Sequence, residues 1–304
     1  MLLTRRRFLL SVGAVGAAVG SDAFLIEPNR LQVTEHMLGE SLQPGRPKVR
    51  FVQVSDLHLQ RVNAHAQQIA EEVNRQAPDF VVITGDSIDR PNHLGELGDL
   101  LDLFTASTPK YAILGNWEYQ CFADLPALAK VYAARNCRLL VNETAEHWVG
   151  ESRLLITGLD DWMGGQPSID RALYGVEPSG NHLLLMHCPG YREMLPRVLW
   201  EPRETGGQEA YFAATELPAS PGFRTATNET MHHIDYMLSG HTHGGQITFF
   251  GAAPVTPVGS GRYVKGWYRD GGPALYVSRG LGTTTIPARF CALPELPVFE
   301  WTLA

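Results

Sequence analysis

Short apolar runs that alternate with helical segments are the feature that most constrains how this chain folds. Residues 49–54, 80–84 and 111–114 are apolar runs of strand length, and each ends at glycine or a polar residue. Between them, apolar residues recur at helical spacing in 64–76 and 94–104. This alternation predicts a layered α/β fold in which polar residues gather at the carboxyl ends of the strands.

The second half of the chain is richer in strands than the first. Its short apolar runs are 139–141, 154–156, 183–186, 236–238, 246–250, 274–277 and 297–300. With an edge strand expected at 31–34, they predict two packed mixed sheets flanked by helices, a four-layer α-β-β-α sandwich.

The predicted domain spans 49–304 and follows a lead-in segment at 26–48. An irregular insertion at about 196–233 contains prolines and glycines and has little periodicity. Such a long irregular segment indicates either a cap near the site or a disordered surface insertion.

The N-terminus has the composition of an export signal. Arg5, Arg6 and Arg7 precede a short apolar run at 10–20, and the arginines before Phe8 resemble a twin-arginine signal. An ordinary basic anchor is the alternative. The run is shorter than the ~20 residues that span a bilayer, so cleavage and retention both stay open. We therefore expect a protein outside the cytoplasmic membrane, in the periplasm or cell envelope. The twin-arginine export machinery would be a partner, membrane association would be through the N-terminus, and residues 1–25 would lie outside the fold.

Charge and cysteine content exclude some classes of protein. The net charge of −7 argues against a nucleic-acid-binding surface that depends on neutralising the backbone phosphates. A phosphate substrate remains compatible, because bound metals supply positive charge locally. The four cysteines are widely spaced, so neither a zinc ribbon nor a disulfide scaffold is expected. We expect them to be small buried residues.

Residues that can bind metals follow several of the predicted strands. The candidate ligands are Asp56, His58, Asp86, Asn116, His187, His241 and His243. Carboxylates and imidazoles together suit Mn, Fe, Co, Ni or Zn. Seven ligands are too many for one zinc with an open position. They fit two divalent ions that share a carboxylate at a typical separation of ~3.5–4 Å.

The order of these motifs resembles that of the calcineurin-like metallophosphoesterase superfamily. Within it, the chain is most similar to the bacterial branch typified by YkuE and YaeI. The sequence motifs of this chain that carry the resemblance to that branch lie at 54–58, 187–189, 238–246 and 278–282.

The resemblance implies a role for each candidate ligand. Asp56, His58 and His243 would hold the first metal ion, and Asn116, His187 and His241 the second. Asp86 would bridge the two ions, of which manganese is the first expectation. A bridging water or hydroxide would attack phosphorus, and Asp86, Asn116 and His241 are the expected catalytic residues.

One position departs from the family pattern. The family's Gly-Asn-His reads Gly115-Asn116-Trp117 in this chain. The resemblance assigns that histidine to phosphate binding and to protonation of the leaving group, which an indole cannot perform. Loss of a general acid typically costs ~10²–10⁴-fold. The substitution therefore favours a leaving group that departs as a stable anion, as in a pyrophosphate or an activated ester. Alternatively, His147, His232 or His233 supplies the proton, or activity is degenerate.

Two further residues are candidate substrate contacts. Trp117 offers a face for a nucleobase or an acyl chain, a role that Trp162 would share, and Arg279 offers a cation for phosphate, as does Arg289. The alternatives are ordinary partial burial of the aromatic rings and structural roles for the arginines.

The expected activity is hydrolysis of a phosphodiester, a pyrophosphate or an activated phosphomonoester. The expected partner is a phosphorylated small molecule or a lipid-linked or nucleotide-sugar envelope substrate. The resemblance to this branch implies UDP-2,3-diacylglucosamine as one such substrate, although that reaction belongs on the cytoplasmic face and the N-terminal signal points outward. A catalytically weakened metal- or phosphate-binding envelope protein is the alternative. The His-x-His-x-Asp-His string of other two-metal hydrolases is absent from the sequence.

Overall fold

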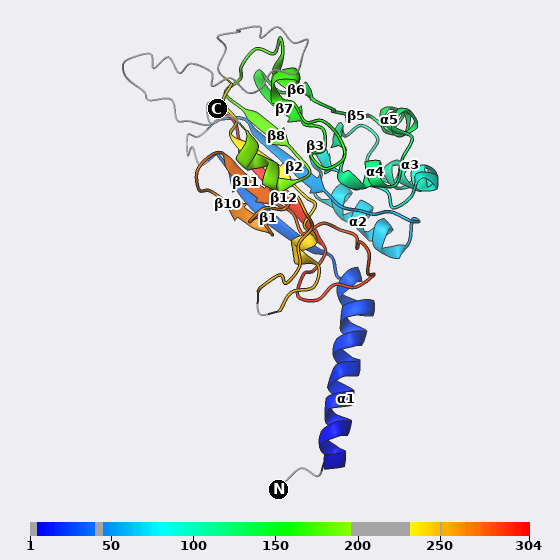
Figure 1. The fold of residues 1–304 in the computed structure, drawn as a ribbon. Coiled ribbons are helices and arrows are strands. Elements are labelled where there is room, and N and C mark those ends of the chain that lie inside the picture. Colours follow the sequence, from blue (N-terminus) through cyan, green and yellow to red (C-terminus); the bar gives the residue numbers. More distant parts are fainter. Residues whose placement is uncertain (1–4, 40–44, 196–231, 250) are drawn as a thin grey trace.

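The computed structural model describes residues 5–39, 45–195, 232–249 and 251–304 (Figure 1). Its α-helices are α1 (Arg5–Ser21), α2 (Ala64–Arg75), α3 (Leu94–Asp102), α4 (Asn116–Gln120), α5 (Leu125–Ala133) and α6 (Ile169–Leu173). Shorter helical turns are η1 (Asp22–Ile26), η2 (Glu27–Asn29), η3 (Pro91–His93), η4 (Pro189–Met194) and η6 (His243–Gly245). The predicted insertion at 196–233 lies almost entirely outside the described residues.

Twelve described strands form two six-stranded mixed sheets. The first sheet has the order β1-β12-β2-β3-β4-β5, with β1 (Gln32–Leu38), β2 (Lys48–Val54), β3 (Phe80–Thr84), β4 (Lys110–Ile113), β5 (Cys137–Leu139) and β12 (Glu295–Thr302). The second has the order β10-β11-β9-β8-β7-β6, with β6 (Glu143–Val149), β7 (Ser152–Gly158), β8 (His182–Leu185), β9 (Tyr236–Ser239), β10 (Gly266–Tyr268) and β11 (Ala274–Val277).

Alternating side chains place the two sheets face to face. In β2, Val49 and Phe51 enter the core between the sheets, whereas Val52 and Val54 pack on the opposite face with the helices. This alternation follows from the two-residue repeat of a strand. The helices α2, α3 and α5 cover the first sheet, and α6 and η4 cover the second. The predicted four-layer α-β-β-α sandwich is therefore confirmed.

One predicted strand is wrong. Residues 246–249 form only isolated bridges, from Ile247 to Phe290 and from Phe249 to Ala252. Gln246 has a φ of 49°, which bends the chain, and its side chain bonds the backbone of another loop. A run held in this way cannot pair continuously along a sheet.

Two expectations about burial also need correction. Cys137 and Cys188 are buried as expected, but Cys121 is half-buried and Cys291 is exposed. Ala23 belongs to the residues expected outside the fold, yet it is buried, and its carbonyl oxygen accepts the Arg289 backbone N–H at 2.9 Å. The N-terminal segment therefore contacts the body before β1 begins.

The N-terminal helix projects away from the sandwich (Figure 1). Residues Leu10–Asn29 form a stretch of 20 residues with a mean hydropathy of 1.4, of which 6% is buried. This stretch is longer than the apolar run 10–20, because the helical path continues through η1 and η2. By length and composition alone it is able to cross a membrane, as a signal sequence also would.

Candidate metal centre

The seven predicted ligands come from the carboxyl ends of strands in both sheets. Asp56 and His58 follow β2, Asp86 follows β3, and Asn116 begins α4 after β4. The strands β2, β3 and β4 are parallel neighbours, so their carboxyl ends share one edge of the sheet. His187 follows β8, and His241 and His243 follow β9, its parallel neighbour in the second sheet. The structure brings all seven side chains to one place.

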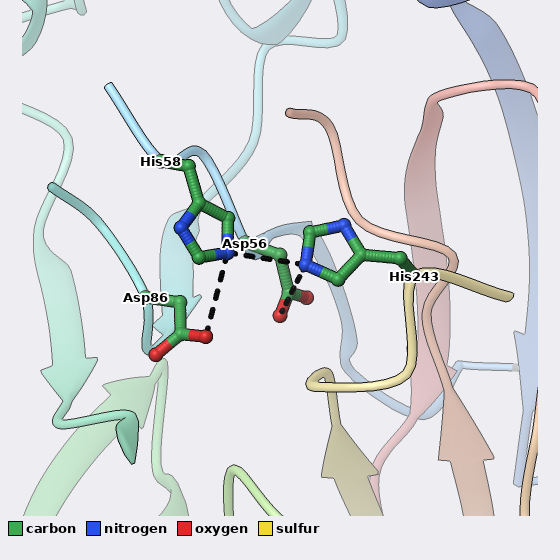
Figure 2. Close-up of side chains that lie close together, drawn as sticks. All are labelled: Asp56, His58, Asp86 and His243. Atoms are coloured by element: carbon green, nitrogen blue, oxygen red, sulfur yellow. Dashed lines mark hydrogen bonds and ion pairs between the residues drawn. The ribbon is translucent and has the colours of Figure 1, made fainter. Parts of the chain in front are cut away.

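Asp56, His58, Asp86 and His243 form what we call the first donor group (Figure 2). Nε2 of His58 lies 3.1 Å from Nε2 of His243 and 3.5 Å from Oδ2 of Asp86. Nε2 of His243 lies 3.8 Å from Oδ1 of Asp56. Two imidazole nitrogens and two carboxylates therefore converge on one point, as a divalent ion requires.

Asp86, Asn116, His187 and His241 form the second donor group. Oδ1 of Asn116 lies 3.0 Å from Nε2 of His187 and 2.8 Å from Nδ1 of His241. Nε2 of His187 lies 3.3 Å from Oδ2 of Asp86, the same oxygen that faces His58. One carboxylate oxygen thus belongs to both groups. This arrangement fits a pair of ions that share a ligand.

The backbone of the donor residues is strained. Asp56, His58, Asp86, His241 and His243 all have positive φ values, between 42° and 75°. Residues other than glycine seldom adopt this conformation, and each such residue costs roughly 1–3 kcal/mol. The bends turn each side chain off its strand toward the centre, and strain of this kind is typical of functional sites.

Glycines next to the ligands allow the loops to approach closely. A Cβ at Gly115 would collide with the Asp86 carboxylate, and a Cβ at Gly240 would collide with Ser55 and the Asp56 carboxylate. The Gly-Asn and Gly-His motifs therefore have a steric cause. Only glycine leaves room for the neighbouring carboxylate.

The second nitrogen of each imidazole has a different neighbour. Nδ1 of His187 lies 2.8 Å from the Thr84 carbonyl oxygen, and Nε2 of His241 lies 2.8 Å from that of Val258. These nitrogens must donate, which leaves Nε2 of His187 and Nδ1 of His241 free to bind a metal. Nδ1 of His58 is buried without a hydrogen-bond partner in the described chain. Nδ1 of His243 lies 3.4 Å from the Arg289 guanidinium.

Glu118 is a site residue whose role the sequence did not reveal. Its carboxylate is buried and accepts N–H groups from Gly115, Asp86 and Ser87 at 2.6–3.1 Å. It therefore ties the loop after β3 to the loop after β4. The available signal was an acidic residue two positions after Asn116, which by itself indicates nothing about burial.

The charge balance of the centre favours cations. Burial would raise the pKa of Asp86, but His187 and His58 hold that pKa below its ordinary value. The pKa of His187 is raised well above 6.5, because Asp86 outweighs the effect of burial. Burial, followed by the Asp86 charge, raises the pKa of Glu118 to about 7. Protonated His187 thus compensates buried carboxylates that a bound metal ion would otherwise neutralise.

A pocket of about 350 Å³ lies over both donor groups. Beside the donors, its wall is formed by Trp117, Gln120, Met163, Pro257, Val258, Thr284 and Thr285.

Trp117 is fixed as part of the pocket wall. Its indole N–H donates to the Asp89 carbonyl oxygen at 2.9 Å, and its ring meets His58 edge-on at 5.2 Å. The residue is half-buried. The position of the Trp117 ring is compatible with a substrate contact. Its indole N–H, however, already donates a hydrogen bond to the Asp89 carbonyl oxygen.

The arginines predicted as phosphate contacts are bound to other parts of the chain, although the Arg289 guanidinium also lies 3.4 Å from Nδ1 of His243. The Arg279 guanidinium binds Glu295 and Gln32, at 3.1 and 2.9 Å, and Arg279 is not among the described residues that line the pocket. Arg289 is buried and donates to the carbonyl oxygens of Gly282 and Ala292. Both geometries are structural, and neither supports a substrate contact.

The other aromatic and histidine candidates also have neighbours outside the pocket. Trp162 packs on Tyr191. His147 contacts Tyr111 on β4, His232 packs on His182, and Nε2 of His233 lies 3.7 Å from the Asp235 carboxylate. The position of these three rings gives no support to proton donation at the centre.

Comparisons with known proteins agree with this geometry. Residues 49–245 match the family model described as calcineurin-like phosphoesterase. Uncharacterized metallophosphoesterase YkuE of Bacillus subtilis is 30% identical over 98% of this chain and 97% of its own length. YkoQ of the same organism, also an uncharacterized metallophosphoesterase, is 26% identical over 83% of each chain. Phosphodiesterase YaeI of Escherichia coli is 24% identical over 98% of this chain and 99% of its own length.

Proposed function

Because the chain belongs to the calcineurin-like phosphoesterase family and is a metal-dependent hydrolase, we propose that it uses two divalent metal ions. One ion would occupy each donor group. The observation that supports a pair is Oδ2 of Asp86, which faces His58 of the first group and His187 of the second. Manganese is the metal that we propose, since the nitrogen and oxygen donors suit ions of this class.

When bound, the ions supply a water of lowered pKa and neutralise charge on the phosphoryl oxygens. The chain's own residues position this chemistry. The backbone carbonyls of Thr84 and Val258 orient His187 and His241. Glu118 holds the Asp86 and Asn116 loops at a fixed separation. Preorganisation of this kind lowers the reorganisation needed in the transition state.

We propose that the substrate is a phosphodiester, a pyrophosphate or an activated ester whose leaving group departs as a stable anion. Trp117 occupies the position of the family's acid and cannot donate a proton. The relative YaeI bears the name phosphodiesterase, which is compatible with the diester class. Lipid-linked and nucleotide-sugar substrates of the cell envelope meet these conditions. The N-terminal arginines and apolar helix support an exported or membrane-anchored location.

Hydrolysis is tested with p-nitrophenyl phosphate, bis-p-nitrophenyl phosphate and a UDP-sugar, each with Mn, Fe, Co, Ni or Zn added. We expect turnover of at least one substrate that depends on the added metal. Two bound ions per chain without turnover of any substrate would instead favour the alternative of a metal- or phosphate-binding envelope protein.

The substrate constraint is tested by Trp117→His, with Trp117→Phe as the matched control. We expect the histidine variant to gain up to ~10²-fold on an alkyl phosphodiester, the lower range for a general acid. Its rate on a pyrophosphate should change little, and the phenylalanine variant should gain on neither. Equal gains on both substrates would contradict the proposed leaving-group preference.

A further inference from the structure

Two loops that contribute residues to the pocket expose large apolar side chains. Val258, Val255, Phe249 and Ile286, which we call the apolar rim, are 78%, 74%, 53% and 46% exposed. Val258 lines the pocket itself, and Ile286 directly follows the pocket residue Thr285. Exposed apolar side chains gathered at one site indicate an interaction surface.

The two loops that bear the apolar rim are joined to each other. The Gln246 side chain donates to the carbonyl oxygens of Thr284 and Ile286, at 3.0 and 2.8 Å, and accepts the Thr284 N–H. The backbone of Thr248 donates to Phe290 at 2.8 Å. These hydrogen bonds hold the two loops together as one surface.

The same surface adjoins the base of the N-terminal helix. Arg289 donates its backbone N–H to Ala23, and the residues that follow Ala23 are exposed and apolar: Phe24, Leu25 and Ile26. In Figure 1, α1 leaves the body at the end where the orange-red loop before β12 lies. One of the loops that bear the apolar rim therefore contacts the chain at the base of the helix, next to exposed apolar residues.

The chain between the helix and the body is too short to separate them. The apolar stretch ends at Asn29, and β1 begins at Gln32. Two residues lie between them, and the three Cα steps from Asn29 to Gln32 reach at most about 10 Å even when fully extended. If residues 10–29 span a bilayer, the body must lie against its surface. The arginines at the start of α1 favour the cytoplasmic side for that end, which places the body outside.

From this contact and the short connection we propose that the apolar rim docks on the outer surface of the membrane that holds α1. The pocket then opens at the level of the lipid headgroups, and its substrate is the phosphorylated headgroup of a lipid. The docking rests on the apolar rim and on α1 in the membrane, whereas this substrate class rests also on the proposed hydrolysis.

Docking is tested with the full chain in phosphatidylcholine and phosphatidylglycerol vesicles that contain a doxyl-lipid quencher. In a Cys291→Ser background, Val255→Cys and Ile286→Cys are labelled separately with an environment-sensitive nitrobenzoxadiazole dye. Tyr174→Cys is the matched control, because Tyr174 is 75% exposed and follows α6, which packs on β6 and β7 away from β10. We expect quenching and a blue shift at 255 and 286, and neither at 174.

Two results would overturn the docking proposal. One is an absence of quenching at both rim positions, or equal quenching at all three. The other is recovery of the protein from cells without α1, as measured by mass spectrometry of its N-terminus.

The proposed substrate class is tested by a separate measurement of hydrolysis. Val255→Glu/Ile286→Glu is compared with Tyr174→Glu on CDP-diacylglycerol in vesicles, a lipid whose headgroup carries a pyrophosphate, and on soluble bis-p-nitrophenyl phosphate. We expect the double variant to lose roughly tenfold on the vesicle lipid, since its rim side chains no longer leave water on docking. Its rate on the soluble ester should be unchanged. Equal losses on both would contradict the lipid assignment, and no turnover by the parent protein would count against hydrolysis and leave the quenching result standing.

Discussion

The two donor groups share Asp86 but differ in how their imidazoles are supported. In the second group, both rings donate their outer N–H to backbone carbonyls, those of Thr84 and Val258. In the first group, Nδ1 of His58 has no hydrogen-bond partner among the described residues, and its nearest carboxylate, Asp89, is 4.0 Å away. Nδ1 of His243 faces the Arg289 guanidinium. A guanidinium has only donors, so it cannot accept an N–H from this ring.

This difference indicates that the second group is preorganised and the first is not. Outer partners of ligating histidines fix the tautomer and ring orientation, and losing one typically lowers metal affinity ~10–100-fold. We therefore expect the second group to bind its ion first and more tightly. The first group would need rearrangement of His58 and His243 before it holds an ion as well.

Removal of the shared ligand should have the largest effect. Asp86→Ala should lower kcat by ~10²–10³-fold, the scale on which one preorganised electrostatic group acts, because neither group keeps a complete ligand set. Metal content by mass spectrometry and turnover of bis-p-nitrophenyl phosphate measure this. Asp86→Asn is the control, since an amide oxygen can still accept the Trp117 N–H. Two ions per chain in both variants would show that Asp86 is not shared.

Single-histidine variants should separate the two groups. His187→Ala should remove the tighter site, whereas His58→Ala should leave it intact, so the two variants should differ by ~10–100-fold in affinity for the first equivalent of Mn²⁺. Isothermal titration of metal-free protein measures the affinities, and thermal melts check folding. If His58→Ala were the variant that lost the tight site, the order of filling would be reversed.

Metal binding should depend on pH more strongly in the second group. In the metal-free site the pKa of His187 is raised well above 6.5, so the ion must displace a proton at neutral pH. Affinity for that ion should rise with pH, and titration in buffers of different ionisation enthalpy should detect proton release. Burial and then His58 lower the pKa of His243 well below 6.5, so this ring is already neutral.

The raised pKa of His187 also determines the direction in which the stability of the metal-free protein changes with pH. A histidine whose pKa is raised on folding stabilises the protein below pH 6.5, and this contribution is lost as pH rises through the folded value. The metal-free protein should therefore lose stability as pH rises above neutral, whereas saturation with metal should remove that trend. Thermal melts with and without chelator measure it. Parallel pH profiles with and without metal would contradict the assignment.

The smallest effect is expected at Asp89. Because its carboxylate is 4.0 Å from Nδ1 of His58, Asp89→Asn should weaken binding in the first group less than tenfold, below the usual range for an outer partner. Competition with a fluorescent chelator measures the change, and Asp99→Asn on α3 is an exposed control. A loss above a hundredfold would show that Asp89 supports His58 fully, and the two groups would then be alike.

The sequence by itself determined the layered fold and the identity of the donors. Alternating strands and helices imply parallel neighbours, and the carboxyl ends of such strands share one edge. Asp56, Asp86 and Asn116 were therefore predictable as one set from local pattern. The strand at 246–250 was not, because the bonds that hold Gln246 come from residues about 40 positions later in the chain.

Tertiary structure alone decided how the two sheets meet. The Asp56 carboxylate accepts the backbone N–H of His241, 185 residues away, and this contact depends on sheet packing that no local spacing encodes. The same packing decided which nitrogen of each ring faces the centre, and it engaged the Trp117 indole and the arginines with backbone and carboxylate partners. Residue type specifies which atoms can bind a metal, but only packing specifies which of them are free to do so.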